Sequence, residues 1–321
     1  MKRILLVKTS SLGDVVHNLP VVSDILKQHP DAHIDWLVEE AFADIPRLHP
    51  AIKQVFTVAV RRWRKQLFSQ QTWCEIASFK KKLSQQPYDL IIDTQGLIKS
   101  ALMSSFAQGR KSGMDKSSAR ESLASYFYDN QHPVARDQHA VTRNRELAAQ
   151  ACGYLLVDNA PNYGITAPSH VFDFALPQSF AMGLHGTSKD SKLWPTSHWI
   201  MLANALSTQQ LCLVMPWSTE AEHQRAQTVA SATDNVVVLP KLRIGELASI
   251  IEKARLAIGV DTGLLHLSAA LNKPTVAIYT DTNPARTGVM ASIHSKAINL
   301  GGVQQTPSVA SVLEAILKVT A

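Results

Sequence analysis

Residues 260–271, VDTGLLHLSAAL, hold the end of an apolar strand, a short polar turn and the start of an apolar helix. Asp261, Thr262 and Gly263 form the turn, and His266 follows one helical turn later. A turn needs one residue of this kind, so three in succession indicate either a helix cap or a ligand site. As a ligand site, the N–H groups at 262–264 would hold a diphosphate, and Gly263 would permit its close approach.

The same succession of apolar strand and helix recurs along the whole chain. Strands are predicted at 3–8, 33–38, 54–60, 88–93, 180–185, 211–216, 236–240, 256–260 and 275–280. Helices are predicted at 14–28, 72–86, 97–107, 139–152, 196–208, 219–230, 244–254, 263–271 and 308–319. Apolar strands without strict alternation, separated by helices, are typical of parallel sheets covered on both faces. We therefore expect an α/β fold of two doubly wound domains with a cleft between them.

The chain of 321 residues is long enough for two domains. A segment rich in proline and without clear periodicity separates its halves. We expect an N-terminal domain at 1–160, a linker at 161–179 and a C-terminal domain at 180–321.

The composition, with 45% hydrophobic and 18% charged residues, is that of an ordinary globular protein. Three scattered cysteines argue against a disulfide framework and favour a reducing compartment. Neither a signal peptide nor an apolar run long enough to cross a membrane is recognisable, so we expect a cytoplasmic protein. Residues 1–160 carry 21 Lys and Arg against 16 Asp and Glu, which predicts an anionic partner for this half.

A second polar turn follows the first predicted strand, in VKTSSLGDVVHNLP (7–20). Ser, Thr and Asp are preferred at helix starts, so Asp14 could simply cap the next helix. Alternatively, Gly13 turns the backbone so that Asp14 faces the cleft as a general base. Spacing alone favours the cap.

A third polar loop, within LHGTSKDSKLWPTSHW (184–199), brings Thr187, Ser188 and Lys192 next to a helix start. One such loop is usually a solvated surface. Two in one domain favour a site for a nucleotide or a sugar nucleotide.

Several alternative chemistries lack their sequence patterns. The chain has neither G-x-G-x-x-G nor a P-loop, and neither D-x-D nor H-E-x-x-H. We therefore expect no metal site and no cofactor. Lys192 and helix dipoles would then stabilise a departing diphosphate.

RRWRK (61–65) concentrates four positive charges around Trp63. It could be an ordinary solvated turn, and nucleic acid is disfavoured because no nucleic-acid module accompanies it. An anionic lipid head group fits better, because arginine binds phosphate and tryptophan favours the membrane interface. Trp73 and the lysines at 80–82 extend this predicted patch.

Several segments, in order from residue 1 to about 280, resemble the bacterial lipopolysaccharide heptosyltransferases of glycosyltransferase family 9. The segments at 8–20 and 261–271 match the two family signatures. The segments VEEAFADIP (38–46), VAVRRWRK (58–65), DTQGLIKSAL (93–102) and KLWPTSHW (192–199) resemble the heptosyltransferase I subfamily in particular.

The resemblance implies a GT-B fold, in which two Rossmann-like domains face a cleft. It implies inverting, metal-independent transfer of L-glycero-D-manno-heptose from ADP-heptose to the Kdo of Kdo2-lipid A. It places the protein on the cytoplasmic face of the inner membrane, in peripheral contact with the anionic surface.

By motif position, the resemblance also implies a role for individual residues. Asp14 would be the general base. The donor would be held by Thr187, Ser188, Lys192, Glu222, Asp261, Thr262, Gly263 and His266, with Glu222 at the ribose. The acceptor would be held by Arg61, Arg64, Lys65 and Arg120.

The chain departs from the family pattern at Ser218, where glycine is usual, and at YTDTNP (279–284), where YGPTDP is usual. Both loops would border the donor pocket. The alternatives are another core heptosyltransferase, a nucleotide-sugar epimerase of the same architecture, or a non-catalytic lipid-binding homologue.

Overall fold

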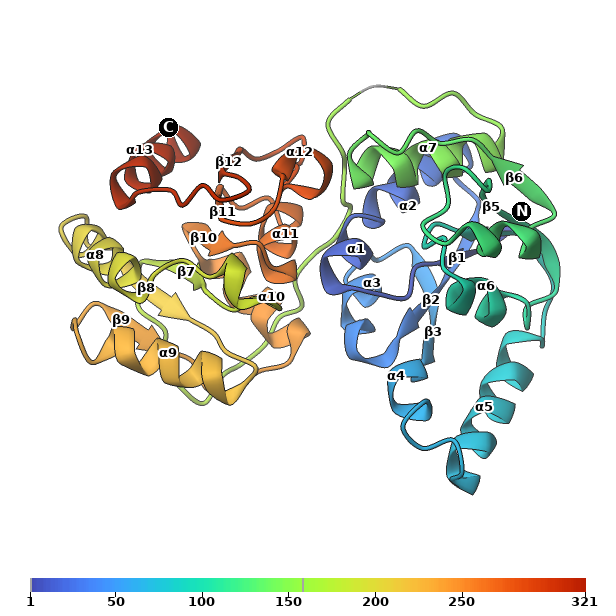
Figure 1. The fold of residues 1–321 in the computed structure, drawn as a ribbon, viewed down its shortest axis with the longest axis horizontal. Helices are drawn as coiled ribbons and strands as arrows, with labels where there is room; N and C mark the ends of the chain where they lie inside the picture. Colours follow the sequence, from blue (N-terminus) through green and yellow to red (C-terminus); the bar gives the residue numbers. More distant parts are fainter. Residues whose placement is uncertain (1, 158) are drawn as a thin grey trace. The chain divides into compact units, whose positions relative to one another are not determined.

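A computed structural model describes residues 2–157 and 159–321. The chain divides into two compact units, Met1–Ile165 and Thr166–Ala321, each with its own sheet (Figure 1). Among the described residues, no helix combines the length and the apolar character needed to cross a membrane.

Unit 1 is a parallel six-stranded sheet in the order β3-β2-β1-β4-β5-β6. Its strands are β1 Arg3–Val7, β2 His33–Glu39, β3 Ile52–Val58, β4 Tyr88–Asp93, β5 Gly109–Met114 and β6 Asn130–His132. Its helices are α1 Leu12–Val16, α2 Leu19–Gln28, α3 Asp44–Arg47, α4 Val60–Trp63, α5 Gln70–Leu83, α6 Ile98–Ser104 and α7 Ala140–Cys152, with 3-10 turns η1 Glu40–Phe42 and η2 Ser122–Phe127.

Unit 2 repeats this topology in the order β12-β11-β10-β7-β8-β9. Its strands are β7 Phe180–Leu184, β8 Cys212–Met215, β9 Val236–Val238, β10 Leu256–Val260, β11 Thr275–Tyr279 and β12 Ala297–Gly301. Its helices are α8 Thr196–Ser207, α9 Glu220–Ala230, α10 Ile244–Lys253, α11 Gly263–Ala270, α12 Pro284–Thr287 and α13 Val309–Thr320, with a 3-10 turn η3 Asp190–Lys192.

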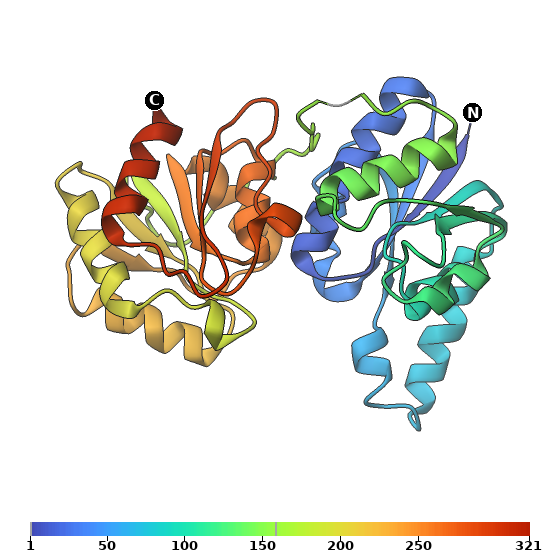
Figure 2. The same ribbon diagram turned by 45° about the horizontal axis from the view of Figure 1, so that its top comes forward.

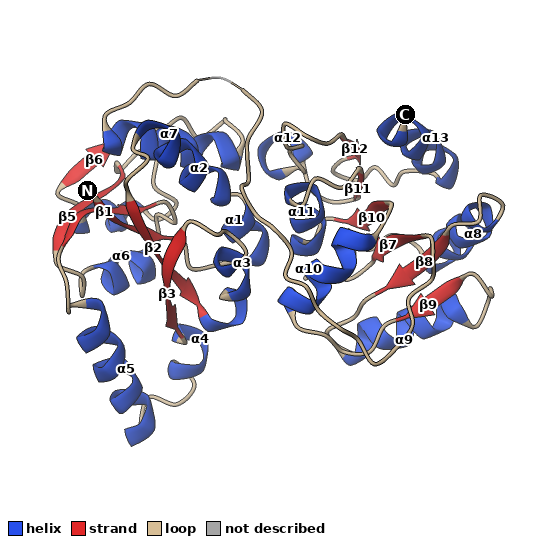
Figure 3. Ribbon diagram, turned by 180° about the vertical axis from the view of Figure 1, so that it is seen from behind, coloured by secondary structure: helices blue, strands red, loops and turns tan. Residues whose placement is uncertain are grey.

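Both sheets have the Rossmann strand order and carry helices on their two faces (Figures 2 and 3). The prediction of a doubly wound α/β fold is confirmed. All nine predicted strands are present, with ends that differ by a few residues.

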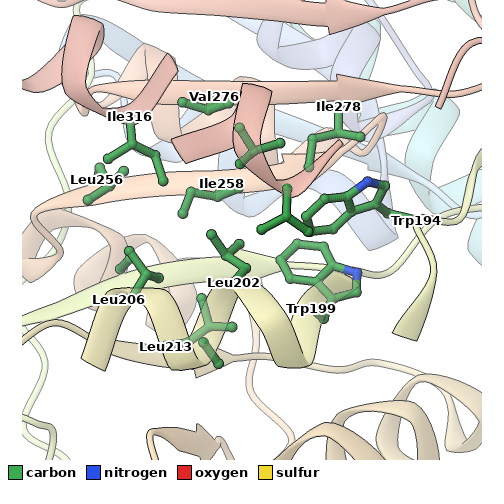
Figure 4. Close-up of a cluster of buried hydrophobic side chains, with 14 of the residues drawn as sticks. Trp194, Trp199, Leu202, Leu206, Leu213, Leu256, Ile258, Val276, Ile278 and Ile316 are labelled. Carbon is green, nitrogen blue, oxygen red and sulfur yellow. The ribbon is translucent and has the colours of Figure 1, made fainter. Parts of the chain in front are cut away.

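The core of unit 2 shows why this layering is stable. Apolar side chains of β7, β8, β10 and β11 meet those of α8 and α13 (Figure 4). Trp194 and Trp199 pack edge to face with ring centroids 5.1 Å apart, and the Trp194 indole donates to the Pro307 carbonyl at 2.9 Å. Both rings are almost fully buried. This packing fixes the loop 185–195 that runs between β7 and α8.

One helix and three strands differ from the prediction. The predicted helix 14–28 is two helices, α1 and α2, because a new helix begins at Leu19, with Asn18 as its N-cap residue and Pro20 in its first turn. The strands β5, β6 and β12 were not predicted. Each lies at or near a sheet edge and lacks a continuous apolar run.

Candidate active site

The strand order of each unit reverses direction once, between β1 and β4 in unit 1 and between β7 and β10 in unit 2. The loops that follow such a strand pair diverge, which leaves a crevice at the carboxyl ends of the strands where ligands bind. The polar turns singled out in the sequence follow β1, β7 and β10. The fold therefore places all three turns at these reversals of strand order, which are called switch points.

In unit 2, the Asp261 carboxylate is the centre of a polar cluster. Its Oδ2 accepts hydrogen bonds from Lys192 Nζ at 2.6 Å and from Thr282 Oγ1 at 2.8 Å. Thr187 Oγ1 donates to the Asp261 carbonyl at 3.0 Å. The Lys192 and Asp261 side chains are 21% and 13% exposed, so their ion pair is largely withdrawn from water. Three predicted donor residues thus converge.

The start of α11 distinguishes between the two interpretations of the turn at 261–263. Thr262 is the N-cap residue, but its side chain makes no capping hydrogen bond. The Asp261 carboxylate is directed to Lys192 and Thr282 instead. The first N–H groups of a helix lack intrahelical acceptors, so α11 presents donors beginning at Gly263. His266 is buried in the next turn of α11.

Glu222 lies at the third position of α9 and closes a capping box with Thr219. Its Oε2 accepts from the Ser218 backbone N–H at 2.7 Å and from Ser218 Oγ at 2.8 Å. Gly186 permits this placement, because a Cβ at that position would lie 2.6 Å from Glu222 Oε1. The carboxylate therefore lies beside Gly186, in the loop that follows β7. Ser188 is exposed on the same loop.

In unit 1, Asp14 occupies the third position of α1. Its Oδ2 accepts from the Ser11 backbone N–H at 2.8 Å and from Ser11 Oγ at 3.1 Å. The capping alternative raised by the sequence is therefore observed. The loop itself is held by Gln95 Oε1, which accepts the N–H groups of Thr9 and Ser10 at 3.0 and 3.1 Å.

Lys8, which sequence reasoning did not single out, is buried beneath this loop. Its ammonium donates to the Thr94 carbonyl at 2.8 Å and to Asn144 Oδ1 at 3.2 Å. Burial lowers the pKa of Lys8 to about 8, although the negative charges of Asp14 and Asp93 partly oppose this. The loop that carries Asp14 thus lies over the buried ammonium of Lys8.

Lys99, on α6, is a second lysine that sequence reasoning missed. Its ammonium donates to Ser10 Oγ at 3.0 Å. Burial lowers its pKa, Glu39 raises it, and the nearby charges of Arg61 and Arg120 lower it further. Arg61 lies on α4 and Arg120 in the loop before η2. The charges of these two predicted acceptor residues therefore act on one ammonium beside the Asp14 loop.

The other cations of RRWRK have different environments. Arg64 and Lys65 are exposed beyond the end of α4. Arg62 is paired with Glu40 at 3.1 Å and Glu75 at 2.9 Å.

The prediction that Trp63 lies at a membrane interface is wrong. Its ring is 7% exposed and packs against Phe79, and its indole donates to Glu75 Oε2 at 2.8 Å. No group of three or more His, Cys, Asp or Glu side chains suited to a metal ion occurs in the part of the chain that the structure describes.

Two Rossmann-type sheets in one chain, each with polar loops at its switch point, form the GT-B fold that the heptosyltransferase structures share with this chain. The family model described as glycosyltransferase family 9 (heptosyltransferase) matches residues 76–314. The chain belongs to this family.

Individual relatives agree with this assignment. The chain is 43% identical over 287 residues to lipopolysaccharide heptosyltransferase 1 of Pseudomonas aeruginosa, covering 89% of this chain and 81% of that protein. It superimposes on a structure of the Escherichia coli heptosyltransferase WaaC with ADP with a TM-score of 0.90, at 37% identity, covering 98% and 99% of the two chains. A structure of WaaC with ADP-2-deoxy-2-fluoro heptose gives a TM-score of 0.86 at 36% identity, covering 99% and 100%. The resemblance to heptosyltransferases is thereby confirmed, and the chain is an enzyme of heptosyl transfer in lipopolysaccharide core synthesis.

Proposed function

We propose that this enzyme transfers L-glycero-D-manno-heptose from ADP-heptose to a hydroxyl of the Kdo in Kdo2-lipid A, with inversion and without a metal ion. The acceptor oxygen forms a bond to the anomeric carbon as the bond from that carbon to the diphosphate breaks. The acceptor proton passes to Asp14, and ADP leaves. In this proposal residues 1–160 hold the acceptor, residues 180–321 hold the donor and residues 161–179 connect them.

The observation that carries the proposal is the cluster of Thr187, Lys192 and Asp261 at the switch point of unit 2. A lysine ammonium beside a helix N-terminus provides charge and N–H donors for a diphosphate. When the diphosphate departs, Lys192 and the amides at 262–264 stabilise its developing charge. Asp261 already holds Lys192 in place, so this stabilisation requires little reorganisation.

Asp14 acts as the general base although it also caps α1. Its cap uses Oδ2, and a carboxylate has enough lone pairs to accept further hydrogen bonds. The fixed position that capping gives the carboxylate is an advantage for proton transfer. Positive charge on the sugar ring is offset by Asp14 or Asp261.

The acceptor is an anionic lipid, and the cations of unit 1 match it. Arg61 and Arg120, whose charges both act on the Lys99 ammonium, bind its carboxylates near the Asp14 loop. Arg64 and Lys65 bind its phosphates. We place the enzyme in the cytoplasm, in peripheral contact with the anionic face of the inner membrane.

The donor side is completed by Glu222 at the ribose hydroxyls, with Ser188, Thr262, Gly263 and His266 at the diphosphate and heptose. Ser218 hydrogen-bonds Glu222 directly, so this departure from the family pattern lies at the proposed ribose contact.

Acceptor-dependent release of ADP tests the proposal. The purified enzyme is incubated with ADP-heptose, with or without Kdo2-lipid A, and with or without EDTA. We expect ADP only when the acceptor is present, and no effect of EDTA. ADP released equally without acceptor would contradict transfer, and loss of activity in EDTA would contradict metal independence.

A further inference from the structure

The segment 60–83 forms a helical hairpin that projects from the sheet of unit 1 (Figures 1 and 2). It consists of α4, a short connection and α5. We call residues 64–69, which join the two helices, the tip. Successive hydrogen bonds from Lys65 N to Arg62 O, Gln66 N to Trp63 O and Ser69 N to Gln66 O give the tip a defined turn structure.

The hairpin carries a net positive charge as large as that of the whole protein. Residues 61–82 include seven Lys and Arg and one Glu, for a net charge of +6. The whole chain also has a net charge of +6, so the remaining residues sum to zero. The one acid, Glu75, is paired with Arg62. A charge concentrated in this way indicates an extended anionic partner.

The tip and the first turn of α5 also expose large apolar side chains. Phe68 is 105% exposed, Leu67 is 51% exposed, and Trp73 at the start of α5 is 59% exposed. The Trp73 indole donates to the Leu67 carbonyl at 2.8 Å, which ties the ring to the tip. Exposed apolar side chains scattered singly need no explanation, but three gathered at one projecting end do.

Other residues make the buried contacts of the hairpin with the sheet. Its core face consists of Trp63, Phe79 and Leu83, which are buried against the sheet. Phe79 also packs against Phe106, with ring centroids 6.2 Å apart. The helix α5 is therefore anchored by one face, while the tip presents a separate apolar group to solvent.

We propose that the tip is a membrane wedge: Leu67, Phe68 and Trp73 enter the interfacial layer of an anionic lipid bilayer while the surrounding lysines and arginines bind its phosphates. This names the segment that makes the membrane contact of the proposed function, and it rests on that function only for the nature of the acceptor. Amphipathic anchors combine apolar insertion with basic residues in this way.

Charge decides between a bilayer and the main alternative, a second copy of the chain. Two tips that met across a dimer would bring together two hairpins of net charge +6, and like charges disfavour that contact. A bilayer rich in anionic lipid attracts the same charge.

The hairpin also connects the bilayer to the acceptor site. Arg61, at the base of α4, donates its backbone N–H to Glu39 Oε1 at 3.1 Å, and the Glu39 N–H donates to the Thr9 carbonyl of the Asp14 loop at 3.1 Å. Arg64 and Lys65 follow about one helical turn further along, as the first residues of the tip, ahead of Leu67 and Phe68. Along the hairpin, the arginine proposed to bind the sugar comes first, the cations proposed to bind the phosphates come next, and the exposed apolar residues come last. A lipid-linked sugar has its sugar, phosphates and acyl chains in the same order from water to membrane.

Vesicle binding without donor or acceptor tests the wedge. The full chain is mixed with vesicles of phosphatidylcholine alone or of phosphatidylcholine with phosphatidylglycerol. We expect binding to the anionic vesicles, weakened on the order of tenfold or more by Leu67→Ser with Phe68→Ser. Lys81→Gln with Lys82→Gln should weaken binding about fivefold per charge at low salt.

The chain offers a matched control in Leu123→Ser with Tyr126→Ser. These two residues of unit 1 are 59% and 69% exposed, outside the hairpin. Their substitution should leave vesicle binding unchanged. Failure of the unsubstituted chain to bind anionic vesicles, equal binding by the tip variant, or loss of binding in the control instead would each overturn the proposal. Dimerisation of the chain that the tip substitutions abolish would overturn it in favour of a second copy.

Trp73 reports insertion directly. The other five tryptophans are buried or half-buried, so Trp73 is the indole available to lipid. Brominated lipid should quench the fluorescence of the vesicle-bound chain, and Trp73→Phe should remove that quenching. Quenching that survives Trp73→Phe would overturn insertion at the tip.

An activity measurement separates this proposal from the proposed function. Leu67→Ser with Phe68→Ser should raise KM for acceptor embedded in vesicles but leave turnover of an acyl-free Kdo acceptor unchanged. Absence of transfer to either acceptor by the unsubstituted chain would refute the proposed function while leaving the vesicle result intact. An equal loss on both acceptors would place the tip in the sugar site and overturn the wedge.

Discussion

Asp14→Asn separates the two roles that the structure allows for Asp14. The carboxylate caps α1 by accepting two hydrogen bonds from Ser11 at 2.8 and 3.1 Å. The Asn side chain keeps one carbonyl oxygen in the same place, so the cap loses no more than about 1 kcal/mol. It cannot accept the acceptor's proton, so turnover loses the contribution of a general base. That contribution is about 10²- to 10⁴-fold, or roughly 3 to 5 kcal/mol of activation free energy.

The magnitudes therefore differ enough to be told apart. We expect kcat for Asp14→Asn to fall at least about a hundredfold, while the Kd for ADP stays within a few-fold and the melting temperature changes little. Ser11→Ala is the matched control, because it removes one capping contact and retains the carboxylate. It should lose far less activity than Asp14→Asn. A folded Asp14→Asn enzyme with turnover close to that of the unsubstituted enzyme would refute the general base and leave Asp14 as a cap alone.

Three further predictions concern the remaining charged groups. Arg61→Ala with Arg64→Ala should raise KM for the acceptor more than the Kd for the donor, measured by steady-state kinetics and calorimetry; the reverse would remove these residues from the acceptor site. Lys192→Met should weaken ADP binding about 10- to 100-fold because a charge-assisted hydrogen bond is lost, and unchanged calorimetric affinity would exclude Lys192 from the diphosphate site. Burial lowers the pKa of Lys8 from its ordinary 10.5 to about 8, so between these pH values the unfolded chain binds one more proton and the free energy of unfolding should rise with pH relative to Lys8→Met, by about 3 kcal/mol. A difference between the two urea-unfolding curves that does not change with pH would contradict burial of the ammonium.

The sequence predicted the fold because the central strands of both sheets are continuous apolar segments. Such strands are buried on both faces, so their pattern does not depend on neighbours. The strands β5, β6 and β12 escaped prediction because they lack a continuous apolar run: β6 is three polar residues and β5 is GRKSGM. Pairing with an existing sheet, rather than local preference, makes these residues strands.

The candidate site was predictable only where polar residues follow a strand directly. Asp261 and Lys192 were identified in this way, and the fold brings them within 2.6 Å although they lie 69 residues apart. Lys8 and Lys99 were not identified as site residues, because their environment comes from residues 86 to 136 positions away. Trp63 was misinterpreted because its burial depends on packing against α5, which also supplies its hydrogen-bond partner Glu75.

The central claim is that the enzyme transfers heptose to the Kdo of Kdo2-lipid A without a metal ion. The most direct measurement is a mass spectrum of Kdo2-lipid A after incubation with the enzyme and ADP-heptose in EDTA. We predict a product heavier than the acceptor by one heptosyl residue. Unchanged acceptor in the presence of folded enzyme would contradict the claim, and the loops at Ser218 and 279–284 would then direct a search among other nucleotide sugars.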